Sequence, residues 1–444
     1  MDAREVALLT LNACERQGGW SDGVLKKQIA AAGLDSRDAG LATQLCFGVI
    51  QNRILLDFYL SKFSNIPLRR LEGKVLQALR LGLYQMLFLT RIPHSAAVDQ
   101  SVALTRAHCK NPRAPGMVNA ILRNLERSLD RLPTIPEDDP AEYYATLYSH
   151  PVWLVRELLE TLGSEGTAAF LQADNSQPPI TTMVNTVKTD LEGALEALQA
   201  EGVHGEPHPW LKNCLVLSRS GSLEELDAFQ NGLFYVQDPA SRLAVLALDP
   251  EPGDRVLDMC AAPGGKSFAA AIQMRDQGEI WSCDLHPHKK TLIQKGAQRL
   301  GLTCIRPQTA DGKVRRPEWE GAFDRVLVDA PCSGLGVIRK KPDIRFKDPE
   351  PLAGLPQVQS AILDNAAGYV KPGGVLVYST CTILERENRE VTDAFLAAHP
   401  EFRRERFLLP GPAGEVSGGQ ITLWPQVHGT DGFYICKLRK DGEA

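Results

Sequence analysis

Two cysteines follow predicted strands and could act together in covalent catalysis. Cys332 lies in the segment Asp329-Ala-Pro-Cys-Ser-Gly, and Cys381 lies in Tyr378-Ser-Thr-Cys-Thr. Strand ends of a parallel sheet meet at one edge, where ligands bind. A thiolate there can add to an electron-poor carbon and divide a difficult reaction into easier steps. Because a free thiol has a pKa of about 8.5, the site must activate it. Position alone does not distinguish the attacking thiol from its partner.

A glycine-rich turn upstream of the cysteines could hold a ligand at the same edge. Its residues are Cys260, Ala261, Ala262, Pro263, Gly264, Gly265 and Lys266. The two glycines allow a tight turn and a close approach of the backbone to a ligand. A helix that begins near Ser267 would direct its N-terminal amides at that ligand. An ordinary strand–helix connection can have the same composition, so the turn alone does not establish a site.

Asp284 ends the next predicted strand, 20 residues after Gly264, and this spacing suits a carboxylate that binds ribose hydroxyls. The turn lacks the G-x-G-x-x-G pattern, and Pro263 stands where a pyrophosphate loop needs a flexible residue. S-adenosyl-L-methionine carries a ribose but no phosphate. The combination therefore favours this methyl donor over a nicotinamide dinucleotide, and an oxidoreductase is disfavoured.

A thiolate beside a methyl donor suits methylation of cytosine at C5. C5 is a poor nucleophile until a thiolate adds to C6, and the resulting enamine can take the methyl group. Release then requires loss of the C5 proton and departure of the sulfur, which calls for a second acid–base group. Asp329 could stabilise the adduct by a hydrogen bond near N3. The base must leave any helical stack to reach such a site.

The last 210 or so residues carry the pattern that would position these groups. Strands alternate with helical stretches, which is typical of a doubly wound α/β sheet. The predicted strands are 255–259, 279–283, 303–305, 324–328 and 375–379. A smaller α/β unit is predicted upstream from strands at 180–184 and 214–217 and helices at 153–162 and 191–201.

The first 130 or so residues are predicted to be helical. An apolar helix over 71–89 ends before Pro93, and another helix begins near Ser95. Apolar residues at 118, 121, 122 and 125 then follow the spacing of a helix packed on a core. The segment 132–140 is rich in Pro and Asp, which predicts a linker.

Charge and cysteine usage limit the class of protein. Residues 1–131 contain 18 Lys and Arg against 11 Asp and Glu, a net charge of +7, and the remainder carries −12. A basic domain suggests a polyanionic partner. None of the ten cysteines forms a C-x-x-C pair, so no metal site is expected. No apolar run reaches the ~20 residues that span a membrane, and the first residues do not form a secretory signal, so a cytoplasmic location is expected.

A basic loop, Arg339-Lys-Lys-Pro-Asp-Ile-Arg345-Phe346, lies between the two cysteines. Positive charge next to an aromatic ring suits an RNA strand, which binds through phosphate contacts and base stacking. A solvated charged loop would have a similar composition. The position of the loop beside the cysteines favours contact with the substrate.

These segments resemble the Nop/Sun family of RNA cytosine-C5 methyltransferases. The resemblance rests on Val236–Ser241, Asp258–Ser267, Asp284, Asp311, Asp329–Gly336, Tyr378–Cys381, Glu387-Asn388 and Asp431–Tyr434, in that order. It implies a Rossmann-like class I methyltransferase domain in which Cys381 is the nucleophile and Cys332 assists product release. It also implies that S-adenosyl-L-methionine binds through the turn Cys260–Lys266 and through acids at Asp284, Asp311 and Asp329.

The first domain resembles the RNA-binding antitermination factor NusB, through Ile92-Pro93-His94, Ala97–Val102 and Gly116–Leu122. The two resemblances imply an all-α NusB-like domain over 1–135, a small α/β subdomain over 140–232 and the methyltransferase domain over 233–444. This combination implies an enzyme that methylates 16S rRNA, with naked or early-assembly small-subunit RNA as partner. A monomer without membrane association is expected.

Three positions depart from the family pattern. Phe346 stands where Trp is common, Thr382 follows the nucleophile in place of Ser, and Leu384-Glu385 lacks a proline. None of the three positions is a predicted catalytic residue, so they bear on the choice of RNA substrate and not on catalysis. A tRNA or other rRNA cytosine-C5 methyltransferase is therefore an alternative. A non-catalytic RNA-binding assembly factor is another, although such a factor would be expected to lose a cysteine or the cofactor turn. The sequence decides neither the target nucleotide nor the group that removes the C5 proton.

Overall fold

The computed structural model describes residues 1–17, 20–218 and 221–442, which form two compact units. Unit 1 comprises Met1–Ser176 and Lys341–Lys347, and unit 2 comprises Gln177–Lys340 and Asp348–Ala444. The chain therefore leaves unit 2 after Lys340, contributes seven residues to unit 1 and returns to unit 2 at Asp348. Each unit has its own hydrophobic core.

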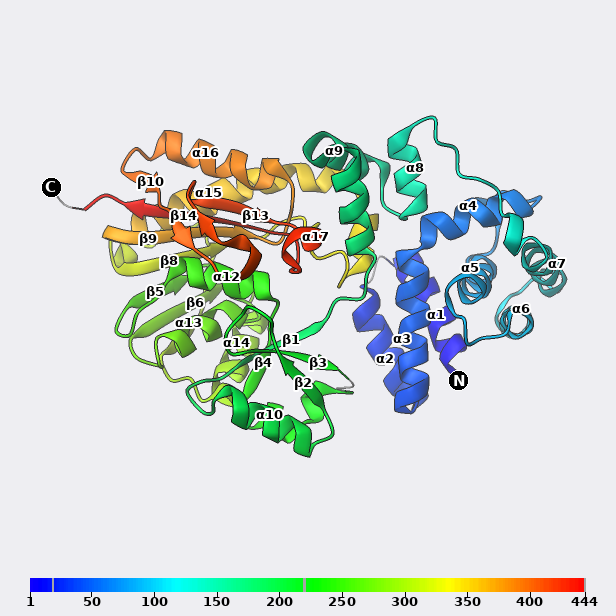
Figure 1. Cartoon of the computed structure of the whole chain (residues 1–444), viewed down its shortest axis with the longest axis horizontal. Coiled ribbons are helices and arrows are strands. Elements are labelled where there is room, and N and C mark those ends of the chain that lie inside the picture. Colours follow the sequence, from blue (N-terminus) through cyan, green and yellow to red (C-terminus); the bar gives the residue numbers. More distant parts are fainter. Residues whose placement is uncertain (18–19, 219–220, 443–444) are drawn as a thin grey trace. The chain divides into compact units, whose positions relative to one another are not determined.

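Unit 1 is helical, as predicted. Its central helix is α5 (Gly73–Phe88), in which every residue from Val75 to Met86 is buried. The other helices are α1 (Ala3–Gln17), α2 (Ser21–Ala32), α3 (Ser36–Gln51), α4 (Arg53–Phe63), α6 (His94–His108), α7 (Ala114–Glu126), α8 (Pro140–Leu147) and α9 (Val152–Asp174), with short 3-10 turns η1 (Leu68–Arg70), η2 (Leu129–Arg131) and η5 (Pro342–Phe346). Helices α1, α3, α4, α6 and α7 all pack against α5 (Figure 1).

The predicted features of these helices have clear physical causes. Pro93 lacks a backbone N–H and directly precedes α6. The apolar stripe of α7 is buried, while Arg123 on its other side pairs with Asp99 at 2.7 Å. No helix or strand forms between residues 132 and 139, where a linker is predicted. Helices α8 and α9 follow in unit 1, so the division between the compact units falls after Ser176.

The segment 341–347 contributes a buried cation to unit 1. Arg345 is 1% exposed. Its Nη1 donates to the carbonyl oxygens of Gln51 at 2.7 Å and Ser149 at 3.0 Å. Both terminal nitrogens donate to Asn175 Oδ1, at 3.2 and 3.1 Å. Burial lowers the pKa of Arg345 to about 10.

Unit 2 begins with a small antiparallel sheet of strand order β2-β3-β1-β4. Its elements are β1 (Ile180–Val184), α10 (Leu191–Ala200), β2 (His204–Pro207), β3 (Cys214–Ser218), the turn η3 (Leu223–Glu225), α11 (Asp227–Gln230) and β4 (Phe234–Val236). Ala194 and Leu198 of α10 belong to the same buried cluster as Val184 and Phe234 of the sheet. The predicted strands at 180–184 and 214–217 and the predicted helix at 191–201 are confirmed, whereas the predicted helix at 153–162 is part of α9 in unit 1. Strands β2 and β4 were not predicted because they are only four and three residues long.

A larger sheet follows, with strand order β10-β14-β9-β8-β5-β6-β7 and β13 paired to β14. The strands from β9 to β7 are parallel, and β14 is antiparallel to β9. The strands are β5 (Arg255–Asp258), β6 (Glu279–Asp284), β7 (Ile305–Thr309), β8 (Phe323–Asp329), β9 (Val370–Thr380), β10 (Phe402–Arg404), β13 (Gln420–Leu423) and β14 (Phe433–Lys440), and β11 (Phe407–Leu408) pairs separately with β12 (Glu415–Val416). All five predicted strands occur, the third of them a few residues later than predicted.

Helices cover both faces of this sheet (Figure 1). They are α12 (Pro239–Leu248), α13 (Gly265–Gln273), α14 (Pro287–Leu300), α15 (Leu355–Tyr369), α16 (Arg389–Ala398) and the short α17 (Pro425–His428), with 3-10 turns η4 (Pro317–Trp319), η6 (Glu350–Gly354), η7 (Glu385–Glu387) and η8 (Gly411–Ala413). This is the predicted doubly wound arrangement, and it places the strand carboxyl ends at one edge of the sheet.

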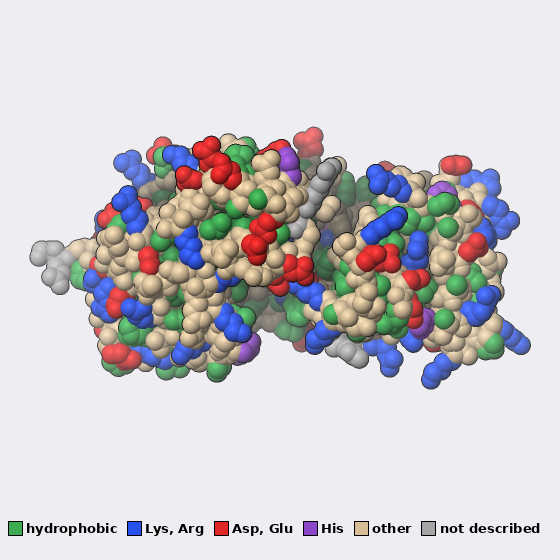
Figure 2. Space-filling view, turned by 90° about the horizontal axis from the view of Figure 1, so that it is seen from below, with side chains coloured by type: hydrophobic (Ala, Val, Ile, Leu, Met, Phe, Trp, Pro, Cys, Tyr) green, Lys and Arg blue, Asp and Glu red, His purple; other side chains and the backbone are tan. Residues whose placement is uncertain are grey.

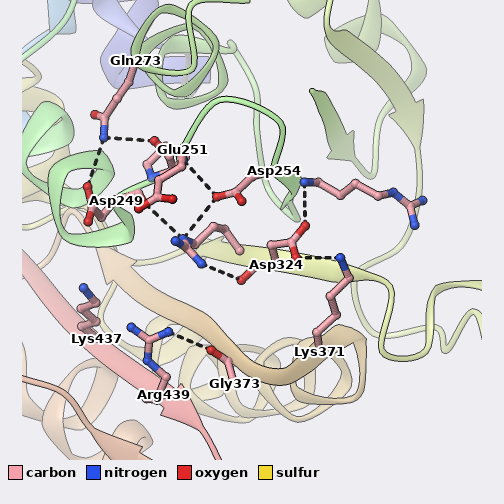
Figure 3. A network of polar contacts seen from close by, with 12 residues as sticks. Asp249, Glu251, Asp254, Gln273, Asp324, Lys371, Gly373, Lys437 and Arg439 are labelled. Carbon is pink, nitrogen blue, oxygen red and sulfur yellow. Dashed lines mark hydrogen bonds and ion pairs between the residues drawn. The ribbon is translucent and has the colours of Figure 1, made fainter. Parts of the chain in front are cut away.

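Ion pairs fasten the other edge, at the amino ends of the parallel strands (Figure 3). Asp324, in β8, accepts a hydrogen bond from the backbone N of Arg255 at 2.9 Å and pairs with Lys371 in β9 at 2.6 Å. Arg325 pairs with Asp254 at 3.5 Å. These contacts join three neighbouring strands far from the cysteines, so they support the fold.

Charged side chains are spread over the surface of both units. Around unit 1, at the right in Figure 2, many Lys and Arg side chains stand at the margin, with acidic side chains among them.

None of the helices formed by the described residues is long and apolar enough to cross a membrane.

Candidate active site

Cys332 and Cys381 follow two neighbouring strands of the large sheet. β8 ends at Asp329 and β9 at Thr380, and the two strands pair in parallel. The Sγ atoms of the cysteines lie 3.2 Å apart. The backbone amide of Gly336 donates to the carbonyl oxygen of Cys381 at 2.9 Å, which joins the two loops. The structure thus brings both predicted thiols together.

The surroundings of the two thiols differ in charge. A hydrogen bond with the Cys332 thiol lowers the pKa of Cys381; burial and the Asp329 carboxylate oppose this shift, and the Lys266 ammonium supports it. The same hydrogen bond, together with burial, raises the pKa of Cys332 well above its ordinary value, and the Glu387 carboxylate adds to this shift. Because the thiolate is the nucleophilic form of cysteine, the asymmetry favours Cys381 as the attacking group.

A buried carboxylate holds the Cys332 loop. Glu387 Oε2 accepts hydrogen bonds from the backbone N of Ser333 at 2.9 Å and from Gln359 Nε2 at 2.8 Å. Gln359 Nε2 also donates to the carbonyl oxygen of Pro331 at 3.0 Å. The residues on both sides of Cys332 are therefore fixed. Sequence reasoning included Glu387 only as part of a family pattern and missed Gln359, since a glutamine within a helix gives no local signal.

A lysine from the predicted cofactor turn binds Asp329. Lys266 Nζ lies 2.6 Å from Asp329 Oδ2, and Ser379 Oγ donates to Asp329 Oδ1 at 2.8 Å. Burial opposes the charge on Lys266, but the charge and hydrogen bond of Asp329, together with the charge of Asp258, raise the pKa of Lys266. An ammonium and a carboxylate thus lie at the same strand ends as the thiols. Sequence reasoning assigned Lys266 to the cofactor turn without this contact.

The predicted turn Cys260–Lys266 connects β5 to α13. The backbone N of Ala261 donates to the carbonyl oxygen of Cys283 at 2.7 Å, and that of Gly264 donates to Ala261 at 2.7 Å. Gly264 has φ 113°, a region that favours glycine. A β-carbon there would lie 2.4 Å from the Phe268 ring. The turn therefore requires glycine both for its backbone angle and for the close approach of this ring.

Carboxylates stand at or just after the ends of four parallel strands. These are Asp258 on β5, Asp284 on β6, Asp311 beyond β7 and Asp329 on β8. Burial raises the pKa of Asp258 to about 7, and the charge of Asp329 acts in the same direction. Asp258 Oδ2 accepts from Ser267 Oγ at 2.7 Å, whereas its buried Oδ1 has no hydrogen-bond partner among the described residues.

This donor set fits S-adenosyl-L-methionine. A buried carboxylate oxygen without a partner invites a hydrogen-bond donor from a ligand. Carboxylates accept hydrogen bonds from hydroxyl and amino groups, which S-adenosyl-L-methionine carries. They repel phosphate groups, which S-adenosyl-L-methionine lacks. Among the described residues, no group of three or more His, Cys, Asp and Glu side chains is arranged to hold a metal ion.

The start of the basic loop differs from the sequence expectation. The Arg339 side chain is 5% exposed and pairs with Asp431 at 2.8 Å and Asp238 at 3.6 Å. Lys340 pairs with the same two carboxylates at 2.8 and 2.5 Å. These cations connect distant segments of unit 2. Their acidic partners lie about 100 residues away along the chain, so the ion pairs could not be predicted from the sequence.

The end of the loop also differs from the expectation. Arg345 is buried in unit 1, and the Phe346 ring lies under the guanidinium of Arg53, 3.5 Å from its central carbon. The side chains of Arg345 and Phe346 are therefore both engaged in contacts within the protein. The prediction that the loop Arg339–Arg345 contacts the substrate is therefore wrong for its buried members, Arg339 and Arg345.

Family models match three consecutive parts of the chain. One described as the NusB family matches residues 1–127, and one described as the ferredoxin-like domain of RsmF/B-like methyltransferases matches residues 150–224. One described as 16S rRNA methyltransferase RsmB/F matches residues 245–439. The predicted fold class is confirmed: a NusB-like helical domain, a small α/β subdomain and a Rossmann-like methyltransferase domain.

Similar proteins extend over the whole chain. A probable ribosomal RNA small subunit methyltransferase B from Bacillus subtilis (strain 168) is 40% identical, and the match covers 99% of each chain. The crystal structure of PH0851 is similar with a TM-score of 0.81 at 26% identity and covers 99% of each chain. A methyltransferase homolog protein from Pyrococcus horikoshii has a TM-score of 0.56 at 28% identity, covering 67% of this chain and 97% of its own.

Proposed function

The chain belongs to the family of 16S rRNA methyltransferases RsmB/F, and we propose that it methylates C5 of a cytosine in 16S rRNA with S-adenosyl-L-methionine as methyl donor. The observation that carries this proposal is the pair of thiols, 3.2 Å apart at the strand ends. A methyltransferase that acts on a ring nitrogen or a ribose oxygen needs no thiol, whereas C5 of cytosine needs a thiolate at C6.

Attack begins with Cys381. Its thiolate, favoured by the lowered pKa, adds to C6 of the flipped cytosine and forms a carbon–sulfur bond. Negative charge moves onto the pyrimidine ring as this bond forms. Lys266, held by Asp329 at 2.6 Å, would lie at the polar edge of the base, where its ammonium stabilises that charge by a hydrogen bond and Asp329 keeps the ammonium in place.

The methyl donor binds at the neighbouring strand ends. We propose that the turn Cys260–Lys266 and the acids Asp284, Asp311 and Asp329 hold it. S-adenosyl-L-methionine supplies an electrophilic methyl group on a sulfonium. The protein positions C5 of the adduct against this group, and positioning alone can account for several kcal/mol of the barrier.

Release restores the aromatic base. A base takes the C5 proton, the electron pair of the C5–H bond forms the C5–C6 double bond again, and the bond from C6 to Cys381 breaks and leaves its electron pair on sulfur. Cys332 lies within 3.2 Å of the departing sulfur and assists this step. Its raised pKa keeps it protonated while Cys381 is the thiolate, so the two cysteines do not compete for the base.

The RNA partner follows from the same family. We propose naked or early-assembly 16S rRNA as substrate, bound by a monomer in the cytoplasm, with the NusB-like domain providing part of the RNA contact. The cytosine at position 967 is the target that this proposal favours. A tRNA or another rRNA cytosine is the alternative substrate.

The test is a methylation assay with defined RNA. Purified protein is incubated with labelled methyl donor and naked 16S rRNA, and bisulfite sequencing then locates 5-methylcytosine; Cys381→Ala serves as the matched control. One new 5-methylcytosine, absent with Cys381→Ala, is expected. Methylation of tRNA alone would reassign the substrate, and a label on any atom other than cytosine C5 would overturn the proposed chemistry.

A further inference from the structure

Unit 2 carries a groove far from the cysteines, at the other end of α13. It consists of two adjoining cavities of about 260 and 710 Å³, which share the lining residues Lys212, Asn213, Arg242 and Gln273. We call these cavities together the α13 groove. It lies between the small antiparallel sheet and the helices that cover the large sheet.

The smaller cavity has a cationic lining. Lys212, Arg242 and Arg275 line it, and no acidic side chain does. None of the three forms an ion pair with any carboxylate of the described residues, although the chain beyond residue 131 carries a net charge of −12. Unpaired cations that line one cavity create a positive potential, which attracts an anion.

Arg242 is held in place at this cavity. Its Nη2 donates to Gln273 Oε1 at 3.0 Å, and Gln273 Nε2 donates in turn to the carbonyl oxygen of Pro250 at 3.3 Å. Figure 3 shows Gln273 next to Asp249 in this network. Burial lowers the pKa of Arg242, so the guanidinium lies where an anion would stabilise its charge. A planar guanidinium held by a neutral amide is well suited to bind a phosphate.

The larger cavity adds an aromatic and apolar surface. Trp210, Phe407 and the 75% exposed Leu408 line it. Gly411 has φ 68°, and a β-carbon there would lie 2.4 Å from the Trp210 ring, so the backbone packs closely against the indole. Phosphate-binding cations beside an aromatic surface are the pattern of a single-stranded nucleic-acid site. Asp249 and the ion-paired Lys437 also line this cavity, so its charge is mixed.

We propose that the α13 groove binds backbone phosphates of single-stranded rRNA that flanks the target cytosine. This inference rests on the proposed function, because it assumes an RNA substrate. Gln273 lies eight residues from Gly265 along α13, roughly 12 Å at 1.5 Å per residue, so the groove binds nucleotides outside the catalytic site. It contributes affinity and register for the RNA, and the cysteines perform the chemistry.

Two substitutions test the proposal, since Lys212 and Arg275 are exposed and their replacement spares the core. Lys212→Gln and Arg275→Gln are each expected to raise KM for 16S rRNA about threefold or more, with kcat and the affinity for S-adenosyl-L-methionine unchanged. The slope of log Kd against log salt should fall by about 0.7 for each phosphate of a single strand that the variant no longer binds. Lys295→Gln, an exposed cation of α14 that lines neither cavity, is the matched control and should change none of these quantities.

Crosslinking provides an independent measurement. With 4-thiouridine in the 16S rRNA, irradiation should crosslink the peptide that contains Trp210, and addition of unlabelled RNA should remove that crosslink. If wild-type protein methylates 16S rRNA while both groove variants keep the KM and salt slope of Lys295→Gln, the groove proposal fails and the proposed function stands. If millimolar inorganic phosphate binds to wild-type protein and not to the variants, without any change in RNA affinity, the groove binds a free anion and the RNA proposal is overturned.

Discussion

The Sγ atoms of Cys332 and Cys381 lie 3.2 Å apart at the ends of adjacent strands. At this distance one thiol can donate a hydrogen bond to the other sulfur. That bond lowers the pKa of Cys381 and raises the pKa of Cys332. The two cysteines are therefore unequal before any substrate binds, and this inequality can be tested residue by residue.

Replacing each cysteine should separate attack from release. Cys332→Ala is expected to accumulate a covalent protein–RNA adduct that survives denaturation, because Cys381 still attacks and elimination is impaired. Cys381→Ala should yield neither adduct nor methylated RNA. Gel electrophoresis of the protein with labelled RNA distinguishes the two outcomes. An adduct with Cys381→Ala and none with Cys332→Ala would reverse the roles.

The hydrogen bond between the thiols should appear in the pH profile of adduct formation. Cys332→Ser keeps a donor for the Cys381 thiolate, whereas Cys332→Ala removes it. Loss of a hydrogen bond to a charged group costs about 1.5 kcal/mol, so the apparent pKa of Cys381 should lie about one pH unit higher in Cys332→Ala than in Cys332→Ser. Adduct formation needs the thiolate, and its rate therefore reaches half-maximum at higher pH in the Ala variant. Rapid-quench measurement across neutral pH provides the test; coincident midpoints would contradict it.

Asp258 should make stability depend on pH in an unusual direction. Burial raises its pKa from 3.8 to about 7 in the folded protein, so the folded state binds a proton that the unfolded state has released. This contribution is fully present below the unfolded pKa and is lost as the pH rises through about 7, by an amount on the order of 4 kcal/mol.

Asp258→Asn, which has nearly the same shape and no titrating group, isolates this contribution. The difference in unfolding free energy between the variant and wild type, from denaturant titrations at several pH values, should grow in favour of Asn from pH about 4 to about 7. A difference that does not change with pH would show that the buried carboxyl is not the group responsible.

Arg345 should be important for the stability of unit 1. In Arg345→Ala the carbonyl oxygens of Gln51 and Ser149 lose a charged donor, which is expected to cost about 3 kcal/mol of unfolding free energy. Thermal denaturation should show a Tm lower by several degrees. Lys341→Ala, an exposed cation in the same segment, is the control and should change Tm by little. An equal Tm for both variants would show that the buried contacts of Arg345 contribute nothing.

The strand ends that carry the chemistry could be predicted from the sequence. Buried parallel strands give continuous apolar runs, and the polar residues that follow β8 and β9 mark their carboxyl ends. That is sufficient to place Cys332 and Cys381 at one edge of a sheet. The strand β14 was missed because Lys437 and Arg439 interrupt its apolar pattern and because its partner strand β9 lies about 60 residues earlier.

Partnerships between distant residues could not be predicted. Arg345 donates to Gln51, 294 residues away, and no local property of an Arg-Phe pair distinguishes a core cation from an RNA contact. Gln359 likewise has the sequence context of an ordinary helical residue. Only the folded structure shows that its Nε2 lies 2.8 Å from Glu387 Oε2. In both cases the decisive quantity is the desolvation of a polar group, and tertiary structure alone determines it.

The excursion of Lys341–Lys347 into unit 1 has a consequence for how the protein is made. The ribosome completes the helices of unit 1 at Ser176, but Arg345 emerges about 170 residues later. At roughly 5–20 residues per second this interval lasts on the order of ten seconds or more. During that time the carbonyl oxygens of Gln51 and Ser149 lack the Arg345 guanidinium that donates to them in the complete protein. The first unit to be synthesised is therefore completed only after β5 to β8, four of the eight strands of the large sheet, have been synthesised.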